Sequence, residues 1–233
     1  MKVLFTSIFI LFVSIGFAQN YKFKNAEKYS EWIMAYQENP EPKKLFAAFE
    51  FGATNQKIAD AGGRALVIAF FGSIFRADST VITDFYGKVK DSNSQNFHYG
   101  FVGSLWMANT AYSKNILNTY MQLESSKKYK SDGKEKERPY NIYTDSIKYA
   151  SNLDLIWADF FATGNPEDIK RIISTLPVNN KISDAAKWSL TSNGIQYKKV
   201  YQIIQSESKE NTNAVIRKKL ILILKDINTE SKK

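Results

Sequence analysis

The stretch that decides the fold is residues 150–177, which read ASNLDLIWADFFATGNPEDIKRIISTLP. In its first half, large apolar side chains recur every three or four positions, as at Leu153, Trp157 and Phe161. This spacing places them on one face of an α-helix. Gly164 follows where a helix would end, because glycine adopts a left-handed backbone without steric cost. The pattern predicts a helix that stops at a glycine.

The second half of the stretch specifies the start of another helix. Asn165 is a good helix-capping residue, and Pro166 suits the first helical position, where a missing N–H does no harm. Asp168 lies near the positive end of this helix, so we interpret it as a helix-start residue rather than a catalytic acid. The apolar face then continues through Ile169, Ile172, Ile173 and Leu176 until Pro177. Together the two halves predict an αα-hairpin.

Similar helical patterns extend to both sides of this hairpin. We expect further helices over residues 26–37, 45–53, 64–75, 79–85, 97–109, 110–123, 183–192, 195–204 and 216–227. Asp78 should cap the helix over residues 79–85. Asn193-Gly194 should separate the helix over 183–192 from the helix over 195–204. Gly100 and Gly103 mark places where a neighbouring backbone can approach closely.

The expected fold class is therefore all-α. Helix pairs would begin near residues 26, 60, 97, 145 and 182, an irregular spacing. Stacked antiparallel pairs form an α-solenoid of the TPR or HEAT kind, in which each pair buries a face against the next. A compact helical bundle is the alternative arrangement. In either case we expect Trp157, Phe160, Phe161 and Trp188 to lie in the core, since large aromatic side chains dominate core burial.

One part of the chain resembles a known group of proteins. The segment 155–166, LIWADFFATGNP, is similar to the W-x-x-F-F-A-T-G segment of a loosely defined family of uncharacterised bacterial helical-repeat proteins. Residues 185–190 and 39–42 resemble further segments of that family. The resemblance implies a fold of helical pairs. It implies no activity, because the family has none established.

Residues 1–18 have the layout of a cleaved secretory signal peptide. Lys2 is followed by an apolar run, and the small residues Gly16 and Ala18 precede the expected cut. Residues 19–233 would then form a single helical domain, with a charged loop at about 124–139, where ten of sixteen residues are charged. We therefore expect a periplasmic or secreted protein.

Composition excludes several classes of chemistry. With no cysteine, the chain has no disulfide, no cysteine nucleophile and no thiolate metal site. His98 is the only histidine, so one chain cannot form a two-histidine zinc site, and no G-x-S-x-G or phosphate-binding glycine motif is present. Asp154 and Asp159 are five positions apart and lie on different sides of one helix. We expect no catalytic residue, metal or cofactor.

Three hypotheses about function follow from these observations. The first is a non-enzymatic helical protein that binds a protein or peptide partner, because stacked helices form long grooves. The second is a binder of polyanions or membrane surfaces, because nine Lys and Arg face four acids from Lys198 onward. Nucleic acid is a poor candidate for an exported protein. The third is a hydrolase whose paired carboxylates the sequence does not identify.

Overall fold

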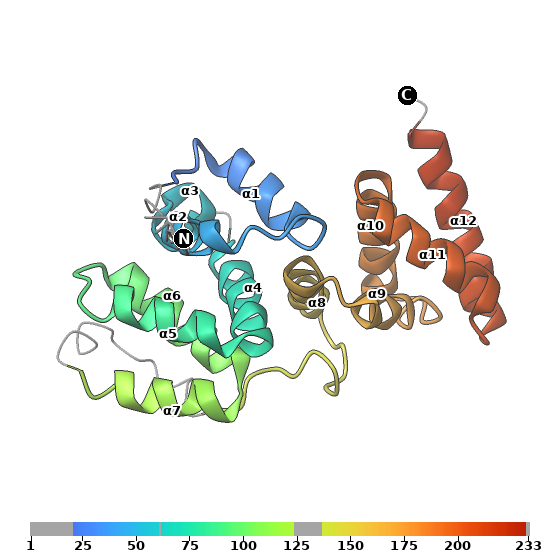
Figure 1. Ribbon diagram of the computed structural model, residues 1–233. Coiled ribbons are helices and arrows are strands. Elements are labelled where there is room, and N and C mark those ends of the chain that lie inside the picture. Colours follow the sequence, from blue (N-terminus) through green and yellow to red (C-terminus); the bar gives the residue numbers. More distant parts are fainter. Residues whose placement is uncertain (1–20, 61, 124–136, 232–233) are drawn as a thin grey trace, which may run out of the picture.

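The computed structural model describes residues 21–60, 62–123 and 137–231 of the 233-residue chain. These residues form helices joined by turns and loops, and they contain no β-strand (Figure 1). The all-α prediction is confirmed. The expected signal peptide (1–18) and most of the expected charged loop (124–136) lie outside the described residues. Within the described ranges, no helix combines the length and the hydropathy needed to span a membrane.

The helices follow the expected order with two short additions. Their bounds are α1 Ala26–Ala35, α2 Leu45–Thr54, α3 Gln56–Asp60, α4 Arg64–Ala77, α5 Ser79–Val89, α6 Gln95–Ala108, α7 Ala111–Tyr120, α8 Ala150–Thr163, α9 Pro166–Ile173, α10 Lys181–Gln196, α11 Lys198–Glu210 and α12 Ala214–Glu230. A 3₁₀ turn, η1, covers Pro42–Lys44. The pattern did not predict α3, because its five residues are too few to show a periodicity.

Helix α4 lies at the centre of the molecule. It packs mainly against α6 on one side and α8 on the other, as its position in Figure 1 shows. A regular solenoid would instead stack α8 on the pair that precedes it in the chain. The arrangement around α4 therefore corresponds to the bundle alternative. From α8 onward, α8 packs on α9, α10 on α11 and α11 on α12, while α10 packs back on α8 rather than on α9.

Glycine allows α4 and α6 to approach closely. A Cβ atom at Gly103 would lie 2.7 Å from Cδ1 of Ile68, and one at Gly72 would lie 2.7 Å from Cβ of Met107. A Cβ at Gly100 would lie 3.2 Å from a ring carbon of Phe49 in α2. At both α6 glycines the close neighbours are side chains and not the predicted backbone, and the space left by the missing Cβ lets α6 pack against α4 and α2.

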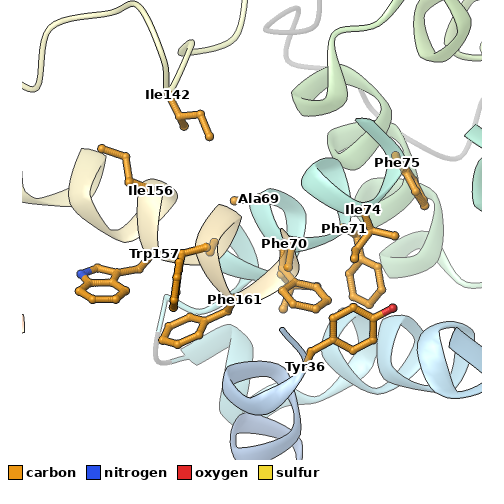
Figure 2. Packing of buried hydrophobic residues seen from close by; sticks show 14 of the residues in the cluster. Tyr36, Ala69, Phe70, Phe71, Ile74, Phe75, Ile142, Ile156, Trp157 and Phe161 are labelled. Carbon is orange, nitrogen blue, oxygen red and sulfur yellow. The ribbon is translucent and has the colours of Figure 1, made fainter. Parts of the chain in front are cut away.

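The core is rich in aromatic rings. Figure 2 shows part of it, where Phe70 of α4 lies near Tyr36, with ring centroids 5.6 Å apart. Trp157 stacks on Phe161 with ring centroids 5.6 Å apart. Phe160 has no exposed surface. The prediction that these α8 aromatics are buried is confirmed, and their large apolar area supplies much of the burial that holds α8 on α4.

The hairpin between α8 and α9 has the predicted turn. Gly164 adopts a left-handed backbone with φ of 69° and ends α8. The side chain of Asn165 accepts a hydrogen bond of 3.2 Å from the backbone N–H of Glu167, and Pro166 is the first residue of α9. Asp78 likewise caps α5. Local sequence chemistry thus determines these helix ends.

The predicted helix break at Asn193-Gly194 is wrong. Helix α10 continues through this dipeptide to Gln196, and the chain turns at Tyr197 instead. Gly194 is buried, and a Cβ atom there would lie 2.6 Å from Cδ1 of Ile227. The glycine thus makes room for α12 to pack on α10.

Candidate functional site

A groove with a volume of about 380 Å³ lies among α1, α4, α8 and α10. Each helix contributes residues spaced three or four apart, so each presents one side to the groove. On α8 these residues are Asp154, Trp157, Ala158 and Phe161. The volume falls within the range of about 300–1,000 Å³ that is typical of ligand sites. Most of the lining side chains are apolar.

Trp188 marks the exposed side of this groove. The prediction that it belongs to the core is wrong, because 73% of its surface is exposed. The buried side of α10 carries Ala186 and Leu190, each two positions away and thus on the far side of the helix. Leu66 of α4, 42% exposed, also lines the groove. Exposed large apolar side chains that gather at a concave surface are typical of interaction sites.

Several polar groups of the residues that line the groove have no partner among the described residues, including the buried hydroxyl of Tyr29. The indole N–H of Trp157 is buried and donates no hydrogen bond. Leaving such a donor unpaired costs about 1–3 kcal/mol. The carboxylate of Asp154 forms no hydrogen bond or ion pair with a described residue, and burial raises its pKa. The groove therefore offers a ligand an unpaired hydrogen-bond donor at Trp157 and an acidic group at Asp154.

Asp154 and Asp159 lie on different sides of α8, as predicted. Asp159 is fully buried, and it forms an ion pair with Arg76 of α4. It also accepts a hydrogen bond of 2.7 Å from the hydroxyl of Tyr143. Burial is the main cause that raises the pKa of Tyr143. The hydrogen bond to Asp159 and the negative charge of Asp159 raise it further. The ion pair and the hydrogen bond tie α4 and the segment before α8 to the centre of α8.

Asp168 lies in the first turn of α9, as predicted, and Asn165 caps that helix. Asp168 is buried, with 1% of its surface exposed, and its carboxyl group lies next to that of Asp159. Burial raises the pKa of Asp168 to about 9, and the negative charge of Asp159 adds to this shift. Asp168 is therefore protonated at neutral pH, so that it can donate a hydrogen bond to the Asp159 carboxylate.

The pair of Asp159 and Asp168 resembles the catalytic acid pairs of hydrolases only in that it consists of two carboxyl groups. Since 0% of Asp159 and 1% of Asp168 are exposed, water and substrate reach neither group without separation of α8 and α9. We interpret the pair as a structural contact between these helices. The hydrolase hypothesis stays a prediction. Sequence reasoning missed the pair because it compared acids within one helix and not across the turn at Gly164.

His98 has a structural position. It is fully buried in α6, and its Nε2 lies 2.8 Å from the carbonyl oxygen of Ser92, to which it donates a hydrogen bond. Nδ1 then accepts a hydrogen bond from the hydroxyl of Tyr120. His98 is therefore a hydrogen-bonded structural residue. Across the described ranges, no group of three or more His, Cys, Asp or Glu side chains is arranged to hold a metal ion.

We compared the chain with protein-family models, curated proteins and solved structures. None of them matches. The similarity of residues 155–166 to a helical-repeat family therefore stays a prediction. A functional interpretation of this protein has to rest on the groove and on the surface of its helices.

Proposed function

We propose that the protein is a non-enzymatic binding protein whose groove takes apolar side chains of a peptide segment from a partner. The single observation that carries this proposal is the exposure of Trp188 beside a groove whose other aromatic side chains are buried. Tryptophan contributes disproportionately to binding energy at protein interfaces. Four helices that leave an apolar channel between them offer the geometry in which amphipathic peptides bind.

The edge of the groove supports a peptide rather than a purely apolar ligand. Ser192, Asn193 and Gln196 of α10 line it beside Trp188. Their side chains can form hydrogen bonds with the N–H and C=O groups of a peptide backbone. An apolar centre with a polar edge is the usual composition of a protein interface.

A peptide array tests this proposal. Wild-type protein should bind a subset of immobilised peptides with two or more large apolar residues, and Trp188→Ala should weaken their binding tenfold or more, the loss of about 1.4 kcal/mol or more expected for an interface tryptophan. Leu222→Ala is the matched control, because it also removes an exposed apolar side chain but lies on α12, outside the groove. Equal binding by both variants would disprove the proposal.

A second candidate function is attachment to an anionic membrane surface through α12. The outer side of this helix exposes Val215, Ile221 and Leu222, between 49% and 56% of each. Lys218 and Lys225 lie on the same side and are exposed, with no ion pair to a described residue. Lysines next to exposed aliphatic side chains are typical of helices that lie in the membrane interface. This observation favours the membrane part of the second hypothesis.

Vesicle sedimentation tests this second candidate. The protein should bind phosphatidylglycerol-containing vesicles and not pure phosphatidylcholine, and each of Lys218→Ala and Lys225→Ala should reduce partitioning about fivefold, since a lysine near such a surface contributes about 1 kcal/mol. Binding should weaken as salt increases. Trp188→Ala serves as the control, because it leaves α12 intact. Binding that is independent of lipid charge would argue against this role.

We also propose that the protein acts in the periplasm or outside the cell, after cleavage of residues 1–18. The support for this is the basic start, the apolar run and the small residues before the expected cut. N-terminal sequencing of the protein from the cell envelope and from the medium tests it. A chain that begins at Gln19 is expected, and an uncleaved chain that is confined to the cytoplasm would contradict the proposal.

A further inference from the structure

We infer that the groove is specific for a lysine side chain of the peptide, with Asp154 binding its ammonium group and the indole N–H of Trp157 donating to a peptide carbonyl. This inference rests on the proposed function and names the chemistry of the partner. The two residues are three positions apart on α8, so they lie on the same side of that helix, and both line the groove.

The first step is the charge of the groove. Asp154 is the only charged side chain among the described residues that line it. The chain as a whole carries a formal net charge of +9, so this acid, which is exposed to solvent on a mostly apolar lining, contrasts with its surroundings. Because no described residue neutralises Asp154, a cationic group from outside would be its first ion-pair partner. An anionic ligand group would be repelled at the same place.

The second step is the shape of the cation. A lysine has an apolar four-carbon stem that ends in a compact ammonium group. The stem can lie along the aromatic and aliphatic lining while its end reaches the charged group, as lysine does on apolar protein surfaces. Trp157 and Trp188 both line the groove, and aromatic faces attract cations. The lining therefore favours a cation on an apolar stem over a free inorganic cation.

The third step concerns the buried donor. Trp157 has 6% of its surface exposed, and its Nε1 atom has no acceptor among the described residues. A peptide supplies carbonyl oxygens next to its side chains, so one carbonyl can accept from the indole while the neighbouring lysine pairs with Asp154. A simple alkylamine has an ammonium group that could pair with Asp154, but it has no carbonyl oxygen to accept from the indole N–H of Trp157. The two unpartnered groups together therefore favour a peptide.

Three acetylated tripeptide amides test the inference. Each has leucine at both ends, and the middle residue is lysine, norleucine or glutamate, so that the first two differ only in the ammonium group. Affinity is measured by NMR titration of the full protein. The lysine peptide should bind about fivefold more tightly than the norleucine peptide, the effect of one solvent-accessible ion pair, and the glutamate peptide should bind most weakly.

Two variants separate the roles of the groups. Asp154→Asn should make lysine and norleucine peptides bind equally, whereas Asp91→Asn should leave the fivefold difference intact. Asp91 is the matched control, because it is an exposed acid outside the groove. Trp157→Phe keeps an aromatic ring and removes the N–H, so it should weaken all three peptides to a similar degree. Thermal unfolding of each variant confirms that it is folded.

The outcomes distinguish this inference from the proposed function. If lysine and norleucine peptides bind wild-type protein equally, the groove binds apolar peptides without a preference for lysine, and the inference is wrong. If Trp157→Phe binds all three peptides as tightly as wild type, the assignment of the indole donor is wrong. If none of the peptides binds wild-type protein, and the peptide array gives no signal that depends on Trp188, the proposed function itself is wrong.

Discussion

Three aspartates of one helical hairpin have different environments, although they lie close together in the sequence. Asp154, Asp159 and Asp168 belong to the same αα-hairpin, yet one lines a groove and the other two are buried together. The difference comes from the side of the helix on which each lies and from the element packed against it. Asp168 in particular has its pKa raised, whereas carboxyl groups that form salt bridges usually have theirs lowered.

Asp168 makes the stability of the protein depend on pH. Its carboxyl group is protonated in the folded state up to a pKa of about 9, and in the unfolded state it ionises near its ordinary pKa. Folding therefore takes up a proton between these two values, and stability should fall as pH rises through that window. The slope cannot exceed about 1.4 kcal/mol per pH unit, the limit for one proton.

Asp168→Asn tests this dependence, since asparagine can donate to Asp159 without needing a proton. The variant should lose most of the fall in stability between pH 5 and pH 8, the range in which the wild type weakens by at most about 1.4 kcal/mol per unit. Urea unfolding at several pH values measures it, with Asp91→Asn as the exposed control. Parallel stability profiles for wild type and Asp168→Asn would refute this origin of the pH dependence.

At the scale of helices, end signals and packing glycines have different causes. Gly164 is needed because its backbone is left-handed, and any residue with a Cβ is strained there. Gly194 and Gly103 lie inside helices, and their role is to leave room for a neighbouring helix. Gly87 in α5 has neither constraint, since a Cβ atom there would meet nothing within 4 Å. A glycine can thus be required by the backbone conformation, by close packing of helices or by neither.

Two glycine-to-alanine substitutions should consequently have opposite effects. Gly164→Ala should destabilise the protein by about 1–2 kcal/mol, the cost of a left-handed conformation for alanine. Gly87→Ala should stabilise it by about 0.5–1 kcal/mol, because alanine restricts the unfolded chain and favours helix. Chemical denaturation measures both under the same conditions. A change of the same sign in both variants would contradict the explanation.

At the scale of the whole molecule, α4 connects helices that are distant in sequence. It packs between α6 and α8, and Phe71, without exposed surface, contacts Phe49 of α2 and Phe85 of α5 at ring centroid distances of 5.3 and 5.9 Å. Loss of this helix would expose the buried sides of several others. The stability of the described fold should therefore depend on α4 more than on any helix at its edge.

Phe71→Ala should destabilise the protein by about 3–5 kcal/mol, the usual effect of removing a buried phenylalanine ring. Trp188→Ala removes an even larger ring, but it should change the free energy of unfolding by less than about 0.5 kcal/mol, because Trp188 is 73% exposed. Equilibrium unfolding monitored by circular dichroism compares the two. A large loss of stability in Trp188→Ala would show that its ring belongs to the core and would weaken the groove proposal.

Local sequence patterns specify most of the helices and many of their ends, and composition excludes disulfides. These features depend on residues within a few positions of each other, such as Gly164, Asn165 and Pro166, or on composition alone. Only the tertiary structure decided that α8 packs on α4, that Asp159 meets Asp168 and that Trp188 stays exposed at a groove. Helical periodicity shows that a side chain lies on one face of its helix. Which element covers that face depends on contacts between distant segments, and no local pattern encodes those contacts.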